Sequence, residues 1–330
     1  MKQGFQSDMP KIAVVIPAYR SATTIEEVIR GIPGWVNLIV VVEDGSGDNT
    51  AGLVSSMAKM DPRIHLVCHP SNQGVGGAVL SGYRLACELG AEIIVKMDSD
   101  GQMDVAYLRQ LIGPLVSGEA DYTKGNRFLH ARELRAMPLG RKIGNLGLSF
   151  LTKLASGYWN IFDPSNGYTA IHASVISLLD QASIGRRYFF ETSLLLELSL
   201  VRAVVKDVYI PAQYGDEISY LSKRKALREF PWRLFKGFLR RLWVQYFVRD
   251  FGLFSVFLVG GLALFLFGVI FGAWHWFQSW QLHTGANTGV IMLSVLPIIL
   301  GVQFLLQAVV LDVQNLPVHP LQELDRWKQI

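Results

Sequence analysis

The chain has 330 residues, of which 50% are apolar and 18% charged, and its formal net charge is +4. This composition is too apolar for one ordinary soluble domain, so part of the chain is expected in lipid, and the small charge excess predicts no nucleic-acid partner. The two cysteines, Cys68 and Cys87, fall in a predicted strand and a predicted helix. We therefore expect reduced thiols rather than a disulfide framework or a zinc site. Residues 1–10 show no signal-peptide pattern, and folding is expected to begin near Lys11 in a cytoplasmic domain.

From Lys11 to about Pro211, short β-branched runs alternate with helical patterns. This alternation is typical of a mostly parallel sheet covered by helices, an α/β fold. The predicted strands are 12–16, 38–42, 64–68 and 93–97, and the predicted helices are 22–31, 50–60 and 76–89. Ligands of such open sheets bind at the carboxyl ends of the strands. Polar clusters at 17–19, 43–46 and 98–102 follow strands directly, so we expect them on one rim.

The cluster at the end of the strand 93–97 carries the most specific chemical signal. It places Asp98, Asp100 and Gln102 at alternate positions on a strand edge and the turn after it. Oxygen donors in this arrangement suit Mg²⁺ or Mn²⁺, which also bind phosphate oxygens. The sequence alone is equally compatible with an ordinary polar turn, because Asp, Ser and Gly are common turn residues.

Two segments near the end of the chain are long and apolar. Residues 251–274 and 289–311 contain no charged side chain, and each is long enough to cross a hydrocarbon core of about 30 Å as a helix. Basic residues precede the first segment and follow the second, whereas residues 275–288 contain no Lys or Arg. The distribution predicts a multi-pass hairpin in the cell inner membrane with its loop outside and both termini in the cytoplasm.

A basic and aromatic segment, 223–250, precedes the first apolar segment. Aromatic and aliphatic residues repeat at helical spacing, and arginines and Lys236 mark another face. We expect a helix that lies in the headgroup layer, with Pro231 in its first turn. A helix docked on the sheet is the alternative.

Six motifs in chain order resemble those of family-2 glycosyltransferases, and they are most similar to the polyprenyl-phosphate branch typified by dolichyl-phosphate mannose synthases. They occupy residues 15–19, 41–50, 72–78, 98–102, 125–127 and 163–167. The resemblance covers about residues 11–215. It implies a GT-A nucleotide-diphospho-sugar fold for 11–222, an interfacial segment 223–250, a hairpin 251–311 and a cytoplasmic tail 312–330.

The resemblance also implies roles for individual residues. Asp98, Asp100 and Gln102 would hold the metal, with Asp98 and Asp100 counted as catalytic. The nucleoside-diphosphate site would comprise Pro17, Ala18, Tyr19, Val42, Asp44, Gly74, Gly77 and Ser99. The glycines 74, 76 and 77 are also consistent with a packing turn, and their spacing excludes the Gly-x-Gly-x-x-Gly dinucleotide motif.

The acceptor side is expected to be basic. A lipid monophosphate is already an anionic nucleophile, so the site needs cations more than a strong base. Arg127 and Arg141 match phosphate-binding positions of the family, Asp163 would support them or act as a base, and Glu191 is a second candidate carboxylate. Lys223 and Arg224 are expected to replace the basic loop of the family.

The predicted activity is metal-dependent, inverting transfer of one sugar from a UDP- or GDP-linked donor to an undecaprenyl-type polyprenyl phosphate at the cytoplasmic membrane face. Tyr19 is followed by Arg20 and Ser21 where the family usually has Asn and Glu, which leaves the base open. The alternatives are a processive polysaccharide synthase and a non-catalytic membrane scaffold. The sugar, and whether the chain forms a homo-oligomer, stay open.

Overall fold

The computed structural model describes residues 9–127, 139–211 and 223–323. By its internal contacts the chain divides into two units. The α/β unit comprises Met1–Phe238 and Pro317–Ile330, and the hairpin unit comprises Leu239–Leu316. The residues that immediately follow the hairpin therefore belong to the α/β unit.

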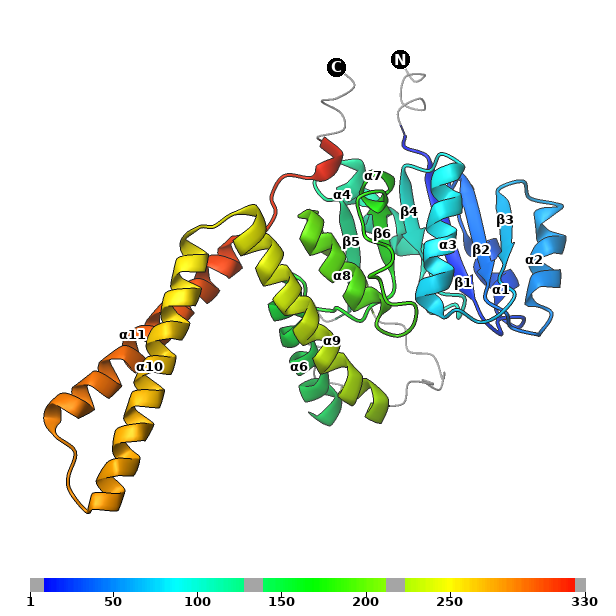
Figure 1. Ribbon diagram of the computed structural model, residues 1–330. Coiled ribbons are helices and arrows are strands. Elements are labelled where there is room, and N and C mark those ends of the chain that lie inside the picture. The colour runs from blue at the N-terminus through cyan, green and yellow to red at the C-terminus, as the bar shows by residue number, and fades with distance from the viewer. Residues whose placement is uncertain (1–8, 128–138, 212–222, 324–330) are drawn as a thin grey trace. The chain divides into compact units, whose positions relative to one another are not determined.

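One seven-stranded sheet forms the centre of the α/β unit (Figure 1). Its strands are β1 (Ile12–Ala18), β2 (Leu38–Glu43), β3 (Ile64–Cys68), β4 (Ile93–Lys96), β5 (Tyr122–Asn126), β6 (Thr169–His172) and β7 (Val205–Tyr209). The order is β3-β2-β1-β4-β6-β5-β7, and only β6 runs antiparallel to its neighbours. The carboxyl ends of β1, β2 and β4 consequently meet at one rim.

Helices cover both faces of this sheet. They are α1 (Ile25–Gly31), α2 (Thr50–Ala58), α3 (Val75–Glu88), η1 (Val105–Tyr107), α4 (Leu108–Val116), α6 (Leu139–Ser156), α7 (Ala173–Ile176) and α8 (Phe190–Val201). Alternate residues of a strand point to opposite faces. Ile12, Val14 and Ile16 of β1 accordingly share a core with α1, α2 and α4, whereas Val15 faces Gly82 of α3. The strands are therefore buried on both sides, which explains their continuous apolar runs.

The predicted α/β fold is confirmed. The four predicted strands agree with β1 to β4 within two residues at each end, and the helices predicted over 50–60 and 76–89 agree with α2 and α3. The helix predicted from residue 22 begins instead at Ile25, because residues 21–24 form a turn in which the Ile25 N–H donates to the Ser21 carbonyl.

The basic aromatic segment is helical, but its start was predicted wrongly. Helix α9 covers Lys223–Trp243, so Pro231 lies inside the helix rather than in its first turn. Proline at an interior position leaves one carbonyl without its helical partner. A π-helical turn, η2 (Val244–Arg249), follows α9 and was not predicted. Leu234 of α9 is buried in a small core with Leu196 of α8 and Ala155 of α6.

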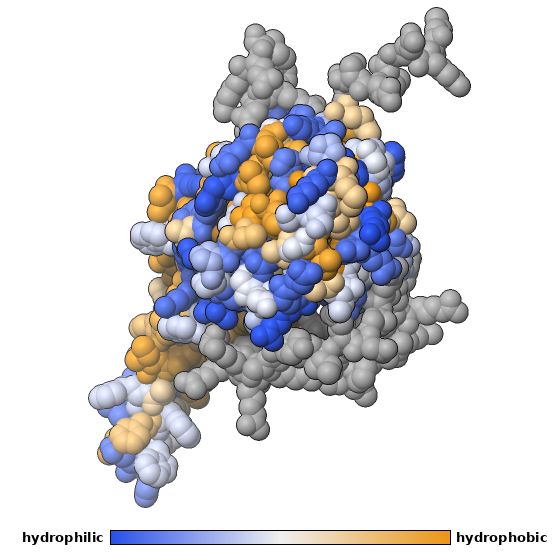
Figure 2. All heavy atoms as spheres, turned by 90° about the vertical axis from the view of Figure 1, so that its right-hand side faces the viewer, coloured by the Kyte–Doolittle hydropathy of each residue, from blue (hydrophilic) through white to orange (hydrophobic). Residues whose placement is uncertain are grey.

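The hairpin unit contains the two apolar helices expected from the sequence. Helix α10 covers Leu253–Leu282 and α11 covers Thr288–Gln314. Both are long and apolar enough to cross a membrane, and only 22% and 6% of their most apolar windows are buried within the protein. In Figure 2 the visible part of the hairpin is orange along its length and paler or blue at its tip, whereas the visible face of the α/β unit mixes blue and orange side chains.

A buried ion pair joins two segments of the hairpin unit. The guanidinium of Arg241 donates to both carboxylate oxygens of Asp312 on α11, at 2.6 and 3.0 Å. Tyr246 of η2 donates its hydroxyl to the same carboxylate at 2.5 Å. Arg241 is 2% exposed and Asp312 5% exposed. A buried arginine with a bidentate carboxylate partner fixes the position of both backbones.

The segment after the hairpin is fastened to the α/β unit by a buried carboxylate. Asp121 accepts hydrogen bonds from the backbone N–H groups of Val204, Leu321 and Gln322, at 2.8, 2.9 and 3.1 Å. The side chain of Gln322 is 3% exposed and donates to the carbonyls of Leu115 and Ala120. The chain thus returns to the sheet-containing unit after α11.

Candidate active site

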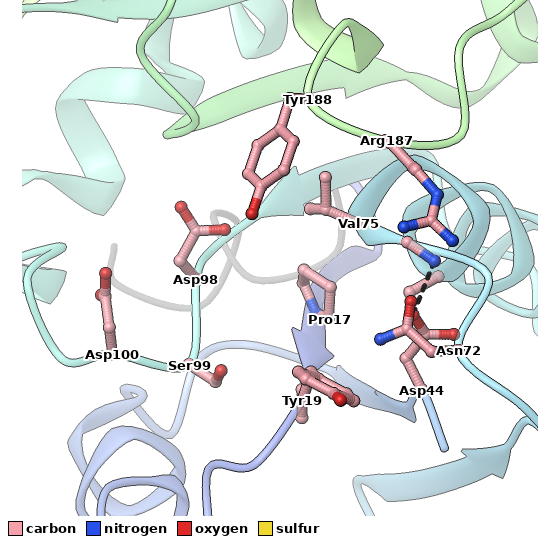
Figure 3. A pocket seen from close by; sticks show the side chains of 13 residues that line it. Pro17, Tyr19, Asp44, Asn72, Val75, Asp98, Ser99, Asp100, Arg187 and Tyr188 are labelled. Atoms are coloured by element: carbon pink, nitrogen blue, oxygen red, sulfur yellow. Dashed lines mark hydrogen bonds between the residues drawn. The ribbon is translucent and has the colours of Figure 1, made fainter. Parts of the chain in front are cut away.

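A cavity of about 670 Å³ opens at the carboxyl ends of β1, β2 and β4 (Figure 3). This is the rim on which the sequence placed its three polar clusters. The lining residues that were predicted for the nucleotide or metal are Pro17, Ala18, Tyr19, Asp44, Gly74, Asp98, Ser99 and Asp100. Val42 and Gly77, also predicted for the nucleotide, are not among the lining residues. Val42 is fully buried behind the rim, and Gly77 lies on the first turn of α3.

Asp44 forms one wall of the cavity and is fixed by three donors. Its carboxylate accepts from the backbone N–H groups of Gln73 and Gly74, at 2.9 and 2.8 Å, and from Nδ1 of His69 at 2.7 Å. The other ring nitrogen of His69 lies 2.9 Å from the Ser81 hydroxyl. These donors fix the Asp44 carboxylate at the cavity wall, and a carboxylate oxygen there is a suitable acceptor for an N–H of a base.

The acidic turn after β4 forms the opposite wall. In Figure 3 the carboxylates of Asp98 and Asp100 rise from the same turn, and Tyr188 extends toward them from the far side. The hydroxyl of Ser99 lies 2.7 Å from that of Ser21, which ties this turn to the Tyr19 turn. Ser21 stands where the family usually has an acidic residue, and here it joins the two halves of the rim.

The chemistry of the acidic turn fits a hard divalent cation. Two carboxylates reach the cavity from it, and the backbone N–H of Gln102 donates to Asp100 at 2.9 Å. The side chain of Gln102 is not among the lining residues. Across the described ranges, no three His, Cys, Asp or Glu side chains gather in one metal-holding group. Such a site suits Mg²⁺ or Mn²⁺ that takes its remaining ligands from a diphosphate.

The predicted acceptor residues Arg127 and Asp163 lie together. Arg127 follows β5, and its guanidinium donates to Asp163 from Nε at 2.8 Å and from a terminal nitrogen at 3.1 Å. Asp163 is 1% exposed, whereas the Arg127 side chain is 33% exposed. A buried carboxylate that accepts from two nitrogens of a guanidinium fixes the orientation of that planar group. The geometry fits the supporting role predicted for Asp163, and that role stays a prediction.

The remaining acceptor predictions stay predictions. Arg141, Lys223 and Arg224 lie outside the residues whose side chains the structure describes.

Two lining residues, Arg187 and Tyr188, were missed by the sequence analysis. They precede α8, and the glycine turn before α3 brings them to the cavity. The Gly76 N–H donates to the Arg186 carbonyl at 2.9 Å, and Gly74, at φ +88°, has no room for a Cβ against the same residue. The glycines thus form a packing turn, one of the two interpretations that the sequence left open. No local pattern around residue 187 indicates this contact.

Two buried lysines beneath the site were also missed. Lys96 ends β4 with its ammonium 2.7 Å from Asp98 and 3.4 Å from Glu191. Burial alone would lower the pKa of Lys96, but the two carboxylates outweigh it and raise the pKa. Lys124 of β5 donates to the Asn166 carbonyl, and burial lowers its pKa to about 8. The sequence did contain a signal for Lys96, because a lysine in an apolar strand two residues before Asp98 is expected to be buried with a charged partner.

Comparison with known proteins places the chain in a family. The family described as "Glycosyl transferase family 2" matches residues 13–179. A UDP-N-acetylglucosamine–dolichyl-phosphate N-acetylglucosaminyltransferase of Methanococcus voltae is 33% identical over 54% of this chain and 75% of the relative. An undecaprenyl-phosphate mannosyltransferase of Micrococcus luteus is 26% identical over 56% and 76%. A polyprenol monophosphomannose synthase of Mycolicibacterium smegmatis is 28% identical over 55% and 69%.

Solved structures agree on the fold. Glucosyl-3-phosphoglycerate synthase from Mycobacterium tuberculosis, in complex with Mn²⁺, UDP-glucose and phosphoglyceric acid, matches with a TM-score of 0.52 and 21% identity, over 70% of this chain and 79% of that chain. This likeness shows the GT-A-like α/β fold. With the family match and the polyprenyl-phosphate relatives, it establishes that the chain belongs to glycosyltransferase family 2 and is a glycosyltransferase similar to the polyprenyl-phosphate branch.

Proposed function

We propose that this chain transfers one sugar from a UDP- or GDP-linked donor to a polyprenyl phosphate at the cytoplasmic face of the membrane. The observation that carries the proposal is the cavity in which Tyr19 and Asp44 face the acidic pair Asp98 and Asp100. An acceptor for a base N–H and a cation site for a diphosphate lie at the two ends of one pocket. These are the two parts that a nucleoside-diphosphate sugar requires.

The acidic pair would hold a divalent cation. When bound, that cation offsets the negative charge that develops on the departing nucleoside diphosphate. Asp98 and Asp100 are the ligands we assign to it, whereas Gln102, which the sequence predicted as a third ligand, does not line the cavity. Tyr19, 45% exposed at the rim, offers its ring to the base.

The sugar moves in a single displacement. An oxygen of the acceptor phosphate attacks the anomeric carbon, the bond from that carbon to the donor diphosphate breaks, and the configuration inverts. The acceptor oxygen carries no proton that must be removed, so no general base is needed. Arg127, oriented by Asp163, would offset the acceptor charge as it approaches the donor.

The hairpin unit provides a means of meeting a lipid-linked acceptor. Helices in the cores of soluble proteins are mostly buried, whereas α10 and α11 are mostly exposed. Exposed aromatic side chains stand at both ends of α10, with Phe251 just before its start and Trp276 and Trp280 near its end. Leu253 and Trp274 of α10 are separated by about 32 Å at 1.5 Å per residue, close to the thickness of a hydrocarbon core.

The return of the chain after α11 supports the proposed orientation. Gln322 packs in the α/β unit, so both ends of the hairpin connect to the unit that carries the site. With a loop that lacks Lys and Arg, the hairpin is proposed to cross the membrane twice and leave the site in the cytoplasm.

The test is a donor screen with purified protein. Radiolabelled UDP- and GDP-sugars are incubated with polyprenyl phosphate and Mg²⁺ or Mn²⁺, and transfer into the organic phase is counted. At least one donor is expected to label the lipid, and Asp98→Asn is expected to reduce transfer by about two orders of magnitude. Asp180→Asn, which changes an exposed carboxylate that does not line the cavity, serves as the matched control. If no donor labels the lipid and metal-dependent hydrolysis is also absent, the scaffold alternative is correct.

A further inference from the structure

Lys96 contacts the proposed metal site from below. It is the last residue of β4, 1% exposed, with its ammonium 2.7 Å from an Asp98 oxygen and 3.4 Å from a Glu191 oxygen. Asp98 is 32% exposed toward the cavity, and Glu191, on the first turn of α8, is 16% exposed. A buried charge is retained only with compensating partners, and here one partner is an expected cation ligand.

The surroundings hold Lys96 in this position. A Cβ added at Gly167 would collide with the Lys96 ammonium and would lie 2.8 Å from the second oxygen of Asp98. The backbone at Gly167 therefore closes directly over both groups. β1 and β6 flank β4, with Val15 and Thr169 paired beside Lys96. The ammonium consequently has little room to leave Asp98.

This arrangement changes the charge that a cation encounters. Asp98 and Asp100 together carry two negative charges, and the ammonium of Lys96 offsets one of them. A cation on Asp98 would share that carboxylate with the ammonium, and like charges at such separations repel strongly. Glu191 weakens this repulsion, because its negative charge partly cancels the positive potential of the ammonium. The two-carboxylate site is therefore a weak one for a free divalent cation.

We propose that Lys96 is a positioning residue that keeps the acidic pair from binding a divalent cation until a nucleoside diphosphate supplies further negative charge and oxygen ligands. The inference rests on the proposed function, since it concerns the same site. It assigns opposite electrostatic roles to two residues. Lys96 weakens binding of the free cation, and Glu191 partly relieves that effect.

The test measures Mn²⁺ binding without any turnover. Free Mn²⁺ is followed by electron paramagnetic resonance in titrations of the purified full chain, first alone and then with UDP or GDP. The wild type is expected to bind Mn²⁺ weakly alone and at least tenfold more tightly with one of the nucleotides. Lys96→Gln is expected to bind Mn²⁺ alone at least tenfold more tightly than the wild type, equivalent to about 1.4 kcal/mol.

Glu191→Gln is expected to change the Mn²⁺ affinity in the direction opposite to that of Lys96→Gln. It keeps the shape of the side chain and removes one partner of Lys96, so Mn²⁺ binding without nucleotide is expected to weaken several-fold. Lys206→Gln removes an exposed ammonium that pairs with Glu119, and it is the matched control expected to stay within twofold of the wild type. If Lys96→Gln does not fold, the direction in which Glu191→Gln changes the nucleotide-free Mn²⁺ affinity tests the role of Lys96.

Three results would overturn the inference. They are tight Mn²⁺ binding by the nucleotide-free wild type, unchanged or weaker binding in a folded Lys96→Gln, and tighter binding in Glu191→Gln. A wild type that binds neither nucleotide with Mn²⁺ contradicts the proposed function itself. If the wild type binds the Mn²⁺–nucleotide complex and Lys96→Gln has the same nucleotide-free Mn²⁺ affinity as the wild type, only the role of Lys96 is contradicted.

Discussion

Arg127 and Asp163 form a charged pair at the proposed acceptor site, and they should not respond equally to substitution. Arg127→Ala removes the cation and is expected to reduce sugar transfer about 100-fold, because a charge-assisted contact to phosphate is lost. Asp163→Asn keeps the arginine but weakens its bidentate support. It is expected to raise the acceptor KM about tenfold with a smaller change in kcat. Steady-state kinetics with varied polyprenyl phosphate measure both.

A surface arginine provides the comparison for this pair. Arg30 pairs with Glu26 one helical turn away, and its side chain is 69% exposed. Arg30→Ala is expected to leave the acceptor kinetics unchanged, because exposed pairs of this kind contribute little. Equal kinetics for Arg127→Ala and Arg30→Ala would move the acceptor site elsewhere, with Lys223 and Arg224 the first residues to test.

Asp207 gives the α/β unit a defined pH dependence. Burial raises its pKa to about 6, and one oxygen accepts from Asn126 and from the Phe162 N–H at 2.8 Å each. Because the folded pKa lies above the unfolded value of 3.8, the contribution of Asp207 to stability is present below about pH 4 and is lost as pH rises through 6. Asp207→Asn is therefore expected to stabilise the protein at pH 8 by on the order of 2 kcal/mol, and not at pH 4.

Asp61 is the control, because its pKa is shifted in the direction opposite to that of Asp207. Its hydrogen bonds to Arg63 lower the pKa of its carboxyl, so its contribution is present at neutral pH and is lost as pH falls through the lowered pKa. Thermal unfolding in detergent from below pH 3.8 up to pH 8 should show Asp61→Asn destabilising at pH 8 and Asp207→Asn stabilising there. The same pH trend in both variants would exclude this account of Asp207.

The sequence was sufficient to predict the positions of site residues that belong to a local motif. Asp98 and Asp100 directly follow one predicted strand, and Asp44 directly follows another strand of the same parallel sheet, so all three could be placed on one rim. Arg187 reaches the cavity only through backbone contacts between two distant turns, which no local pattern encodes. The family resemblance predicted that Arg127 and Asp163 belong to the same acceptor site. Their bidentate hydrogen bonding could not be predicted from the sequence, because it depends on the tertiary structure.

Among the elements, the pair between α9 and α11 is the most informative to disrupt. Removal of one partner leaves a buried charge uncompensated, so Arg241→Met and Asp312→Leu are each expected to destabilise the hairpin unit by about 3–5 kcal/mol. The double variant leaves no unpaired charge and is expected to recover most of that loss. Thermal unfolding of the three variants in detergent measures the coupling, and purely additive losses would argue against a coupled pair.

Element boundaries were predictable where one physical signal dominated. Continuous β-branched runs defined β1 to β4, and long uncharged runs located α10 and α11, although α10 continues past the predicted end at residue 274 to Leu282. The later strands β5, β6 and β7 contain polar and charged residues such as Lys124 and Asp207, whose burial depends on tertiary partners. The start of α9 was misplaced because Pro231 is tolerated inside the helix as well as in a first turn.

At the scale of the whole molecule, the proposed function requires both ends of the hairpin to be on the cytoplasmic side of the membrane, the side of the catalytic unit. Thr284 lies in the loop between α10 and α11, and Cys68 is an exposed cysteine of the α/β unit. In intact cells, a membrane-impermeant thiol reagent is expected to label Thr284→Cys but not Cys68, and to label both after permeabilisation. The single variant Cys68→Ser removes the internal reporter and verifies its signal. Labelling of Cys68 in intact cells would place the site away from cytoplasmic nucleotide sugars.

The most direct measurement is the mass of the lipid product. Purified protein, polyprenyl phosphate, Mn²⁺ and the donor identified by the screen are incubated, and the extracted lipid is analysed by mass spectrometry. The account predicts one product, heavier than the acceptor by a single sugar residue, that is absent from the Asp98→Asn reaction. A ladder of products with increasing numbers of sugars would show a processive synthase. Metal-dependent hydrolysis of the donor without any glycosylated lipid would contradict the polyprenyl-phosphate acceptor.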